Sequence, residues 1–126
     1  MTHLSQQRCT ACHADAERPA AQELATWLAE LPQWQVIQEQ GIPQLEQTYR
    51  FPDFLTALAF TQAVGQAAEA TGHHPCLITE WGQVTVRWWT HAIRGLHRND
   101  FIMAAQTDEL YHRDFGSAVP SSSPQG

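Results

Sequence analysis

Three histidines, gathered by one loop and one strand end, are the side chains in this sequence best suited to chemistry. His73 and His74 stand together before Pro75, and His91 follows a run of strand-forming residues. An imidazole both donates and accepts protons near neutral pH because its unperturbed pKa is about 6.5. Several imidazoles without an evident nucleophile predict proton shuttling on a small neutral substrate.

The three rings meet only under a geometric condition. Pro75 favours extended backbone at His74, so the side chains of His73 and His74 should point to opposite sides and need not do the same job. His91 reaches them only if the last two strands pair as a hairpin. The alternative is that all three are surface histidines with no shared role. A three-imidazole zinc site is disfavoured because adjacent side chains diverge, and we expect no metal and no cofactor.

Hydrophobic periodicity and turn residues predict the elements that must position these rings. In chain order they are a helix from Pro19 until Pro32 ends it, strands over 34–37 and 45–51 around a turn at 41–43, a helix over 53–69, strands over 76–80 and 84–90, and a helix over about 100–111. Gly72 is the expected left-handed cap of the longest helix. His97-Arg-Asn-Asp100 resembles the capping-box start of the last helix, with Asn99 as the alternative cap because histidine is a poor N-cap.

The order α-β-β-α-β-β-α predicts an α+β fold, with a four-stranded antiparallel sheet and three helices packed on one face. The length of 126 residues suits one domain. We expect a flexible arm over 1–18, the domain over 19–113 and a disordered, Ser/Pro-rich tail over 114–126. The open face and edges of so small a sheet favour self-association.

Charge and cysteine content restrict the possible partners. Seven basic against thirteen acidic residues give a net charge of −6, which argues against binding of nucleic acid or an anionic membrane. No apolar stretch approaches the roughly 20 residues of a membrane span. An odd cysteine count and a polar N-terminus predict a cytoplasmic protein. Cys9-Thr-Ala-Cys12-His13 matches a haem-attachment pattern or half of a zinc site, but both signals are weak.

A wider constellation resembles a known family, the pterin-4a-carbinolamine dehydratases, over roughly residues 19–111. It comprises Glu69-x-x-x-His73-His74-Pro75, Trp81, Thr90-His91 and Gly95-Leu96-x-x-x-Asp100. Segments 77–82 and 96–105 are similar to the bacterial branch that serves phenylalanine hydroxylase. Animal members carry Asp where Gly72 stands and Trp where Leu77 stands, so any contacts of those side chains are absent here.

The resemblance implies dehydration of a 4a-hydroxytetrahydropterin to the quinonoid dihydropterin, which recycles the pterin of an aromatic amino acid hydroxylase. It also implies a homodimer or homotetramer. His73, His74 and His91 would be catalytic, Asp100 would give structural support, and the substrate-binding residues would be Glu69, Gly72, Pro75, Trp81, Trp89 and Thr90. Animal members also act as a dimerisation cofactor for a transcription factor. A protein-interaction module, using for instance the helix face over 54–68, is therefore the alternative.

Overall fold

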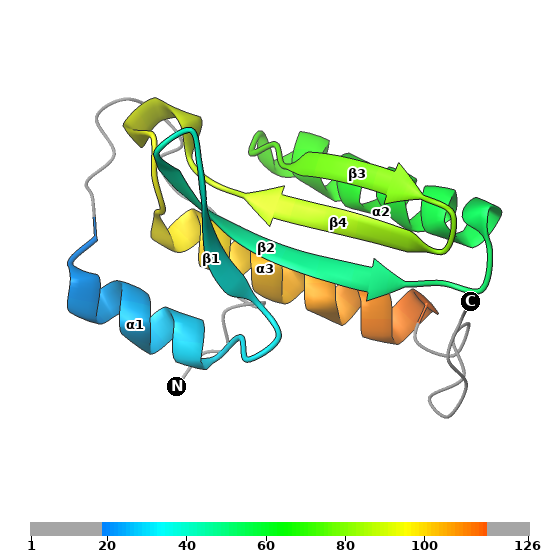
Figure 1. Cartoon of the computed structure of the whole chain (residues 1–126), viewed down its shortest axis with the longest axis horizontal. Coiled ribbons are helices and arrows are strands. Elements are labelled where there is room, and N and C mark those ends of the chain that lie inside the picture. Colours follow the sequence, from blue (N-terminus) through cyan, green and yellow to red (C-terminus); the bar gives the residue numbers. More distant parts are fainter. Residues whose placement is uncertain (1–18, 116–126) are drawn as a thin grey trace.

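The computed structural model describes residues 19–115 (Figure 1). The predicted arm, with Cys9, Cys12 and His13, lies outside the described residues, as does the tail from residue 116 onward. The elements are α1 (Ala21–Ala29), β1 (Gln35–Glu39), β2 (Ile42–Arg50), α2 (Phe54–Thr71), β3 (Cys76–Glu80), β4 (Gln83–Trp88), a 3-10 turn η2 (His91–Ile93), α3 (Arg98–Leu110) and a π turn η3 (Tyr111–Phe115). No helix in this described part is both long and apolar enough to cross a bilayer.

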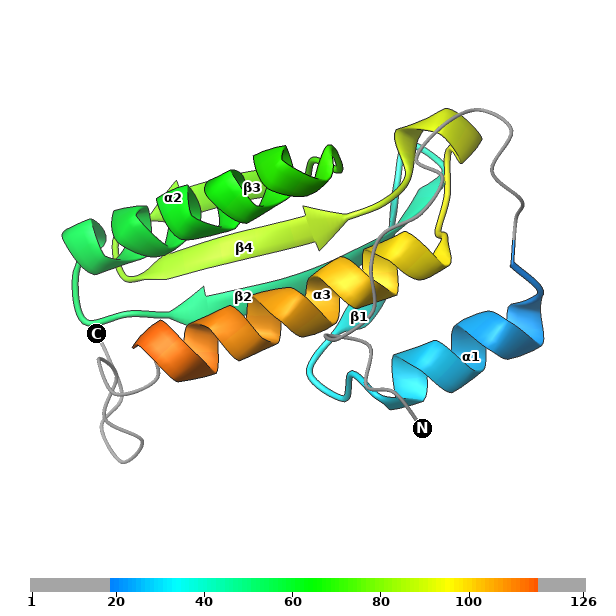
Figure 2. The same ribbon diagram turned by 180° about the vertical axis from the view of Figure 1, so that it is seen from behind.

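Two antiparallel hairpins form the sheet, and they join through their inner strands. The strand order is β1-β2-β4-β3, with every neighbouring pair antiparallel. Figure 2 shows α2 and α3 lying across one face of this sheet. Helix α1 packs beside α3, where the rings of Trp27 and Phe101 have centroids 5.6 Å apart. The predicted α+β architecture is confirmed.

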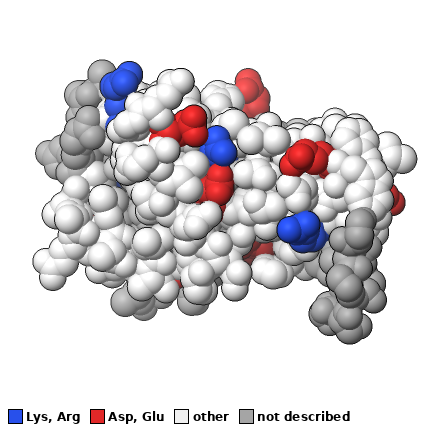
Figure 3. Space-filling model, in the orientation of Figure 1, with Lys and Arg blue, Asp and Glu red and all other residues white. Residues whose placement is uncertain are grey.

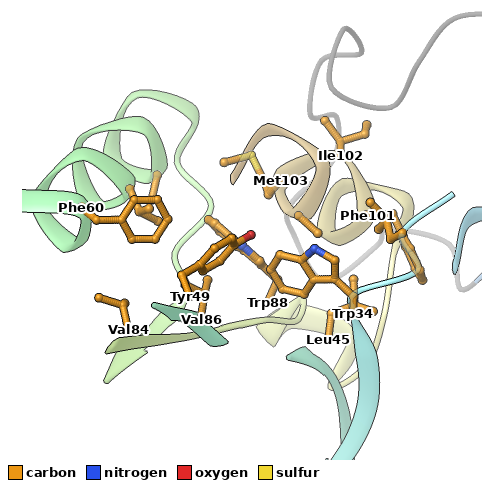
Figure 4. Close-up of a cluster of buried hydrophobic side chains, with 14 of the residues drawn as sticks. Trp34, Leu45, Tyr49, Phe60, Val84, Val86, Trp88, Phe101, Ile102 and Met103 are labelled. Atoms are coloured by element: carbon orange, nitrogen blue, oxygen red, sulfur yellow. The ribbon is translucent and has the colours of Figure 1, made fainter. Parts of the chain in front are cut away.

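Alternation along β4 separates the core from the open face of the sheet. Val84, Val86 and Trp88 are fully buried under the helices, as the sequence pattern predicts (Figure 4). Burial of such apolar side chains contributes about 1.5–3 kcal/mol each and fixes the register of the strand. Trp88 is thereby held rigidly at the end of β4, next to the histidine loop.

The open face of the sheet carries isolated charges and no basic cluster among residues 19–115 (Figure 3). Arg87 of β4 lies between two carboxylates, with its Nε 2.9 Å from Glu46 and its Nη1 3.7 Å from Glu39. The positive charge of Arg87 is therefore balanced by acidic neighbours on this face.

Both ends of α2 have well-formed caps. Asp53 accepts a hydrogen bond from the backbone N–H of Thr56 at 2.7 Å, and this bond lowers the pKa of the carboxyl. At the other end, Gly72 takes the predicted left-handed conformation, with φ of 70°. The backbone N–H of His73 donates to the carbonyl of Ala68, which completes a Schellman motif. The end of α2 therefore fixes the backbone position of His73.

Two local predictions are wrong, and one open alternative is decided. Ile42 and Pro43 belong to β2 and not to the turn. The turn is made by Gln40 and Gly41, which both have positive φ. Pro43 is tolerated because it pairs with an edge strand. Strand β4 ends at Trp88, two residues earlier than predicted. Of the two candidate caps of α3, His97 is the one that the structure uses.

The end of the domain extends slightly beyond the predicted boundary. Asp114 and Phe115, assigned from the sequence to the tail, lie in η3. The ring of Phe115 contacts Phe60 and Phe51, with centroids 5.3 and 6.0 Å apart. An aromatic anchor thus holds these two residues on the core.

Candidate active site

Asp100, fully buried in the first turn of α3, is the centre of the site. Its Oδ1 lies 2.6 Å from Nε2 of His73. Its Oδ2 accepts from the hydroxyl of Thr90 and from the backbone N–H of His97, each at 2.8 Å. One carboxylate therefore joins the histidine loop, the segment after β4 and the start of α3.

These bonds define the tautomer of His73. The contacts of Asp100 include a hydroxyl and a backbone N–H that donate, and an ionised carboxylate only accepts. Nε2 of His73 must then carry the proton that it shares with Oδ1, which leaves Nδ1 as the nitrogen able to accept one. A carboxylate behind an imidazole also stabilises the imidazolium that forms when Nδ1 is protonated.

The ring of His73 is held flat against Trp88. The two rings are nearly parallel, at 5° between planes and 5.6 Å between centroids, and only 4% of His73 is exposed. An offset stack of this kind prevents rotation of the imidazole. The position of His73 is therefore determined by its backbone, its carboxylate partner and its stacked face.

The residues after β4 form a small closed loop that presents His91. Thr90 and Gly95 exchange two backbone hydrogen bonds, of 2.8 and 3.3 Å. Ile93 is 5% exposed, which anchors the loop to the protein interior. The ring of His91 lies on the outside of the loop, in contact with Trp89 at 4.4 Å between centroids.

His74 occupies a different environment from its neighbour. Its Nε2 lies 2.9 Å from Oε1 of Glu69, and the two side chains are 59% and 82% exposed. An exposed pair of this kind stabilises the protein by at most about 1 kcal/mol, so the His74 ring can move toward a ligand.

The comparisons with known proteins fit this arrangement. The family model described as pterin 4 alpha carbinolamine dehydratase matches residues 17–110. The chain belongs to the pterin-4a-carbinolamine dehydratase family. Members of the family are hydro-lyases, and the residues of the constellation lie inside the matched region.

Relatives cover nearly the whole chain. A provisionally named pterin-4-alpha-carbinolamine dehydratase of Gloeobacter violaceus is 56% identical over 86% of this chain and 93% of that protein. One from Microcystis aeruginosa is 50% identical over 90% of this chain and 97% of that protein. Among solved structures, the transcriptional coactivator/pterin dehydratase of Brucella melitensis has a TM-score of 0.66 at 28% identity, covering 75% of this chain and 98% of that chain.

The dehydratase fold brings together most of the residues predicted for the site. His73 and Thr90 meet at Asp100, and Thr90 is the chain neighbour of His91. Among the described residues, no hydrogen bond or ring contact joins His91 to His73 or His74. The structure therefore brings together the backbone segments that carry His73 and His91, through the shared partner Asp100.

Trp81 is not brought to this site within one chain. It lies in the turn between β3 and β4 and is 58% exposed. The five residues of β3 separate that turn from Pro75. At about 3.3 Å per residue, this is a distance on the order of 17 Å.

His97 is a residue whose connection to the site the sequence interpretation did not include. Its ring Nδ1 accepts a hydrogen bond from the backbone N–H of Asn99 at 3.1 Å, and its backbone N–H donates to Oδ2 of Asp100. The available signal was the spacing His97-Arg-Asn-Asp100, which has the form of a capping box with histidine in place of serine or threonine.

Proposed function

We propose that this chain dehydrates 4a-hydroxytetrahydropterin by histidine acid–base catalysis. Membership of the dehydratase family supports the reaction. The observation that carries the mechanism is the buried His73, whose Nε2 is committed to Asp100 and whose Nδ1 is left to accept a proton.

The reaction requires one acid and one base and no change of oxidation state. The acid protonates the hydroxyl on C4a, which leaves as water. The lone pair of N5 then forms the C4a=N5 bond, and the base removes the proton from N5. Proton transfers at two atoms of a rigid bicyclic substrate suit imidazoles held at different angles, each worth about a hundred- to ten-thousandfold in rate.

We assign His73 to the N5 proton or to orientation of the ring. Its fixed tautomer and its carboxylate partner favour a base, because Asp100 stabilises the positive charge that the ring gains. Proton acceptance at Nδ1 needs no movement of a buried side chain.

One of His74 and His91 would act as the acid at the 4a hydroxyl. Both rings are exposed; His74 contacts Glu69, and His91 contacts Trp89. A weakly held imidazole can adjust to either face of the C4a centre. The pterin would lie against the segments Gly72–Pro75 and Trp89–His91.

The decisive experiment follows the decay of 4a-hydroxytetrahydropterin with the wild type and with His73→Ala, His74→Ala and His91→Ala. We expect the His73 variant to lose at least about a hundredfold in kcat. His112→Ala is the matched control, since His112 is exposed, its ring contacts Tyr111, and it lies at the opposite end of α3 from Asp100. Wild-type turnover in all three site variants would disprove the mechanism.

We further propose that the substrate comes from a phenylalanine hydroxylase. Such an enzyme should sustain more turnovers per pterin when this chain is added than when a His73→Ala variant is added. Turnover that does not depend on the active dehydratase would contradict the link. We expect no metal or organic cofactor, so chelator-treated protein should keep its activity.

We also propose a homodimer or homotetramer. Leu55 and Leu58 on α2 are 75% and 44% exposed, and β3 is an edge strand. Light scattering on protein eluted from a size-exclusion column should give a molar mass that is a multiple of the 14.2 kDa chain mass. Leu55→Glu should lower this molar mass if α2 is the interface. A monomer at every concentration would contradict the assembly.

A protein-interaction role is the second candidate, because the name of the Brucella protein includes transcriptional coactivation. The same exposed α2 residues would form the partner surface. A partner whose binding is lost in Leu58→Glu, while dehydration is unchanged, would support this role.

A further inference from the structure

The cap of α3 has a chemical property that the usual capping residues lack. Serine, threonine, asparagine and aspartate accept the capping hydrogen bond throughout the neutral range. His97 accepts it through Nδ1, at 3.1 Å from the backbone nitrogen of Asn99. An imidazole nitrogen accepts only while it carries no proton, so this cap exists only for the neutral ring.

The same residue holds the carboxylate of the candidate site. The backbone N–H of His97 donates to Oδ2 of Asp100, and Oδ1 of Asp100 bonds to His73. Asp100 has no exposed surface, so any shift of the first turn of α3 moves the partner of His73. The cap and the imidazole are therefore connected by two hydrogen bonds.

We propose that His97 is a positioning residue for His73, and that its neutral ring, through the α3 cap and Asp100, keeps the site in its working geometry. Protonation of the ring would remove the cap and add a positive charge at the positive end of the helix dipole. The site would then loosen in acid for a reason separate from the titration of the catalytic rings. This inference rests on the proposed function for its catalytic meaning, but the coupling itself is structural.

The charges around His97 determine the direction of the effect. Burial is the main cause that lowers the pKa of the ring, and the charges of Arg98 on α3 and His73 on the loop before β3 lower it further, against the opposing effect of Asp100. The folded protein thus binds this proton less readily than the unfolded chain. Stability from His97 is complete above the ordinary histidine pKa and is lost as the pH falls below it toward the folded value.

The test compares wild type with His97→Asn, a good cap that does not titrate, and with His97→Ala, which has no cap at any pH. Between about pH 7.5 and about pH 5.5, we expect the protection factor of the Asn99 amide, which is corrected for the intrinsic pH dependence of exchange, to fall in the wild type and to change at least about threefold less in His97→Asn. The nitrogen resonances of His73 should shift in parallel. His97→Ala should resemble the acid form of the wild type already at the higher pH. His112→Asn is the control and should follow the wild type.

Activity gives the second measurement. The acid loss of kcat should be at least about threefold smaller in His97→Asn than in the wild type, since only the catalytic rings then titrate. His97→Ala should lower kcat more than it raises KM. Identical acid behaviour of wild type and His97→Asn, in exchange and in kcat, would overturn the inference. Loss of dehydration in every protein, with the exchange differences intact, would overturn the proposed function and leave the coupling supported.

Discussion

Helix α3 carries two acidic side chains that accept hydrogen bonds from other elements, the buried Asp100 and the half-buried Asp108, and they lie at opposite ends of the helix. Asp100 lies in the first turn, where the helix dipole favours a negative charge, and its partners include a titratable imidazole. Asp108 lies in the C-terminal half and accepts from the hydroxyl of Tyr49 at 2.5 Å and from Nε1 of Trp34 at 3.0 Å. Neither partner of Asp108 exchanges protons near neutral pH.

The electrostatic environment of Asp108 reinforces the contrast. Burial raises the pKa of this carboxyl, against the opposing effect of its two hydrogen bonds. Burial, with the charge of Asp108 next, also raises the pKa of Tyr49. The Asp108 cluster thus joins β2 and the residue before β1 to α3, while the Asp100 cluster holds the imidazole that we propose as the proton acceptor. Substitutions in the two clusters should therefore affect different properties.

Asp100→Asn should have the largest effect. The amide keeps one acceptor oxygen but presents N–H donors to groups that themselves donate, so His73 loses its tautomer and its counter-charge. We expect kcat to fall by at least about a hundredfold. Pterin decay measured beside thermal unfolding checks this, and a fully active Asp100→Asn protein would refute the assigned tautomer.

Thr90→Val removes one hydrogen bond to Asp100 and keeps the shape of the side chain. Thr90 is 1% exposed, so its hydroxyl is occupied by Asp100. We expect about a tenfold loss in kcat and about 1–2 kcal/mol in the free energy of unfolding. A change confined to KM would instead assign the hydroxyl to pterin binding.

Tyr49→Phe should produce the opposite pattern at the other end of α3. The carboxyl of Asp108 loses a donor, which costs about 1–3 kcal/mol of the free energy of unfolding. We expect kcat to stay within about twofold of wild type, because proton transfer does not involve this cluster. Chemical denaturation and the pterin assay together measure both; loss of activity without loss of stability would remove the distinction between the two clusters.

The pH dependence of stability should reveal Asp108 directly. Because its pKa is raised in the folded state, the folded protein binds the proton more tightly than the unfolded chain. Its contribution becomes more favourable as the pH falls from above the folded pKa to the ordinary value of 3.8. Wild type should therefore gain stability relative to Asp108→Asn over that interval. A difference that does not vary with pH would show that Asp108 titrates as it does in the unfolded chain.

Glu69→Gln should have the smallest effect. The Glu69 and His74 side chains are largely exposed, and such a pair contributes at most about 1 kcal/mol, screened by salt. We expect unchanged unfolding and a change in kcat below about threefold. A larger loss in kcat would show that Glu69 orients His74 during the reaction.

The sequence was informative wherever the signal was local. Alternation in β4 correctly predicted the buried Val84, Val86 and Trp88, and Gly72 was correctly predicted as the left-handed end of α2. These features depend on side-chain period and on backbone sterics, which neighbouring residues determine. Errors occurred at the ends of elements. Pro43, for example, lies in β2 and not in the turn, because it pairs with Gln38 of the edge strand β1, where proline is tolerated.

The sequence by itself determined which residue types are available and which short segments carry them. It indicated the histidine loop, the strand end with Thr90 and His91, and a possible capping box at His97. The tertiary structure decided how they are used, because Asp100 meets His73 and Thr90 only after α2, β4 and α3 have packed. One of two adjacent histidines is thereby buried against Asp100, as we expect for the proposed proton acceptor, and the other is left exposed. That difference depends on contacts between residues far apart in the chain, and no local pattern specifies it.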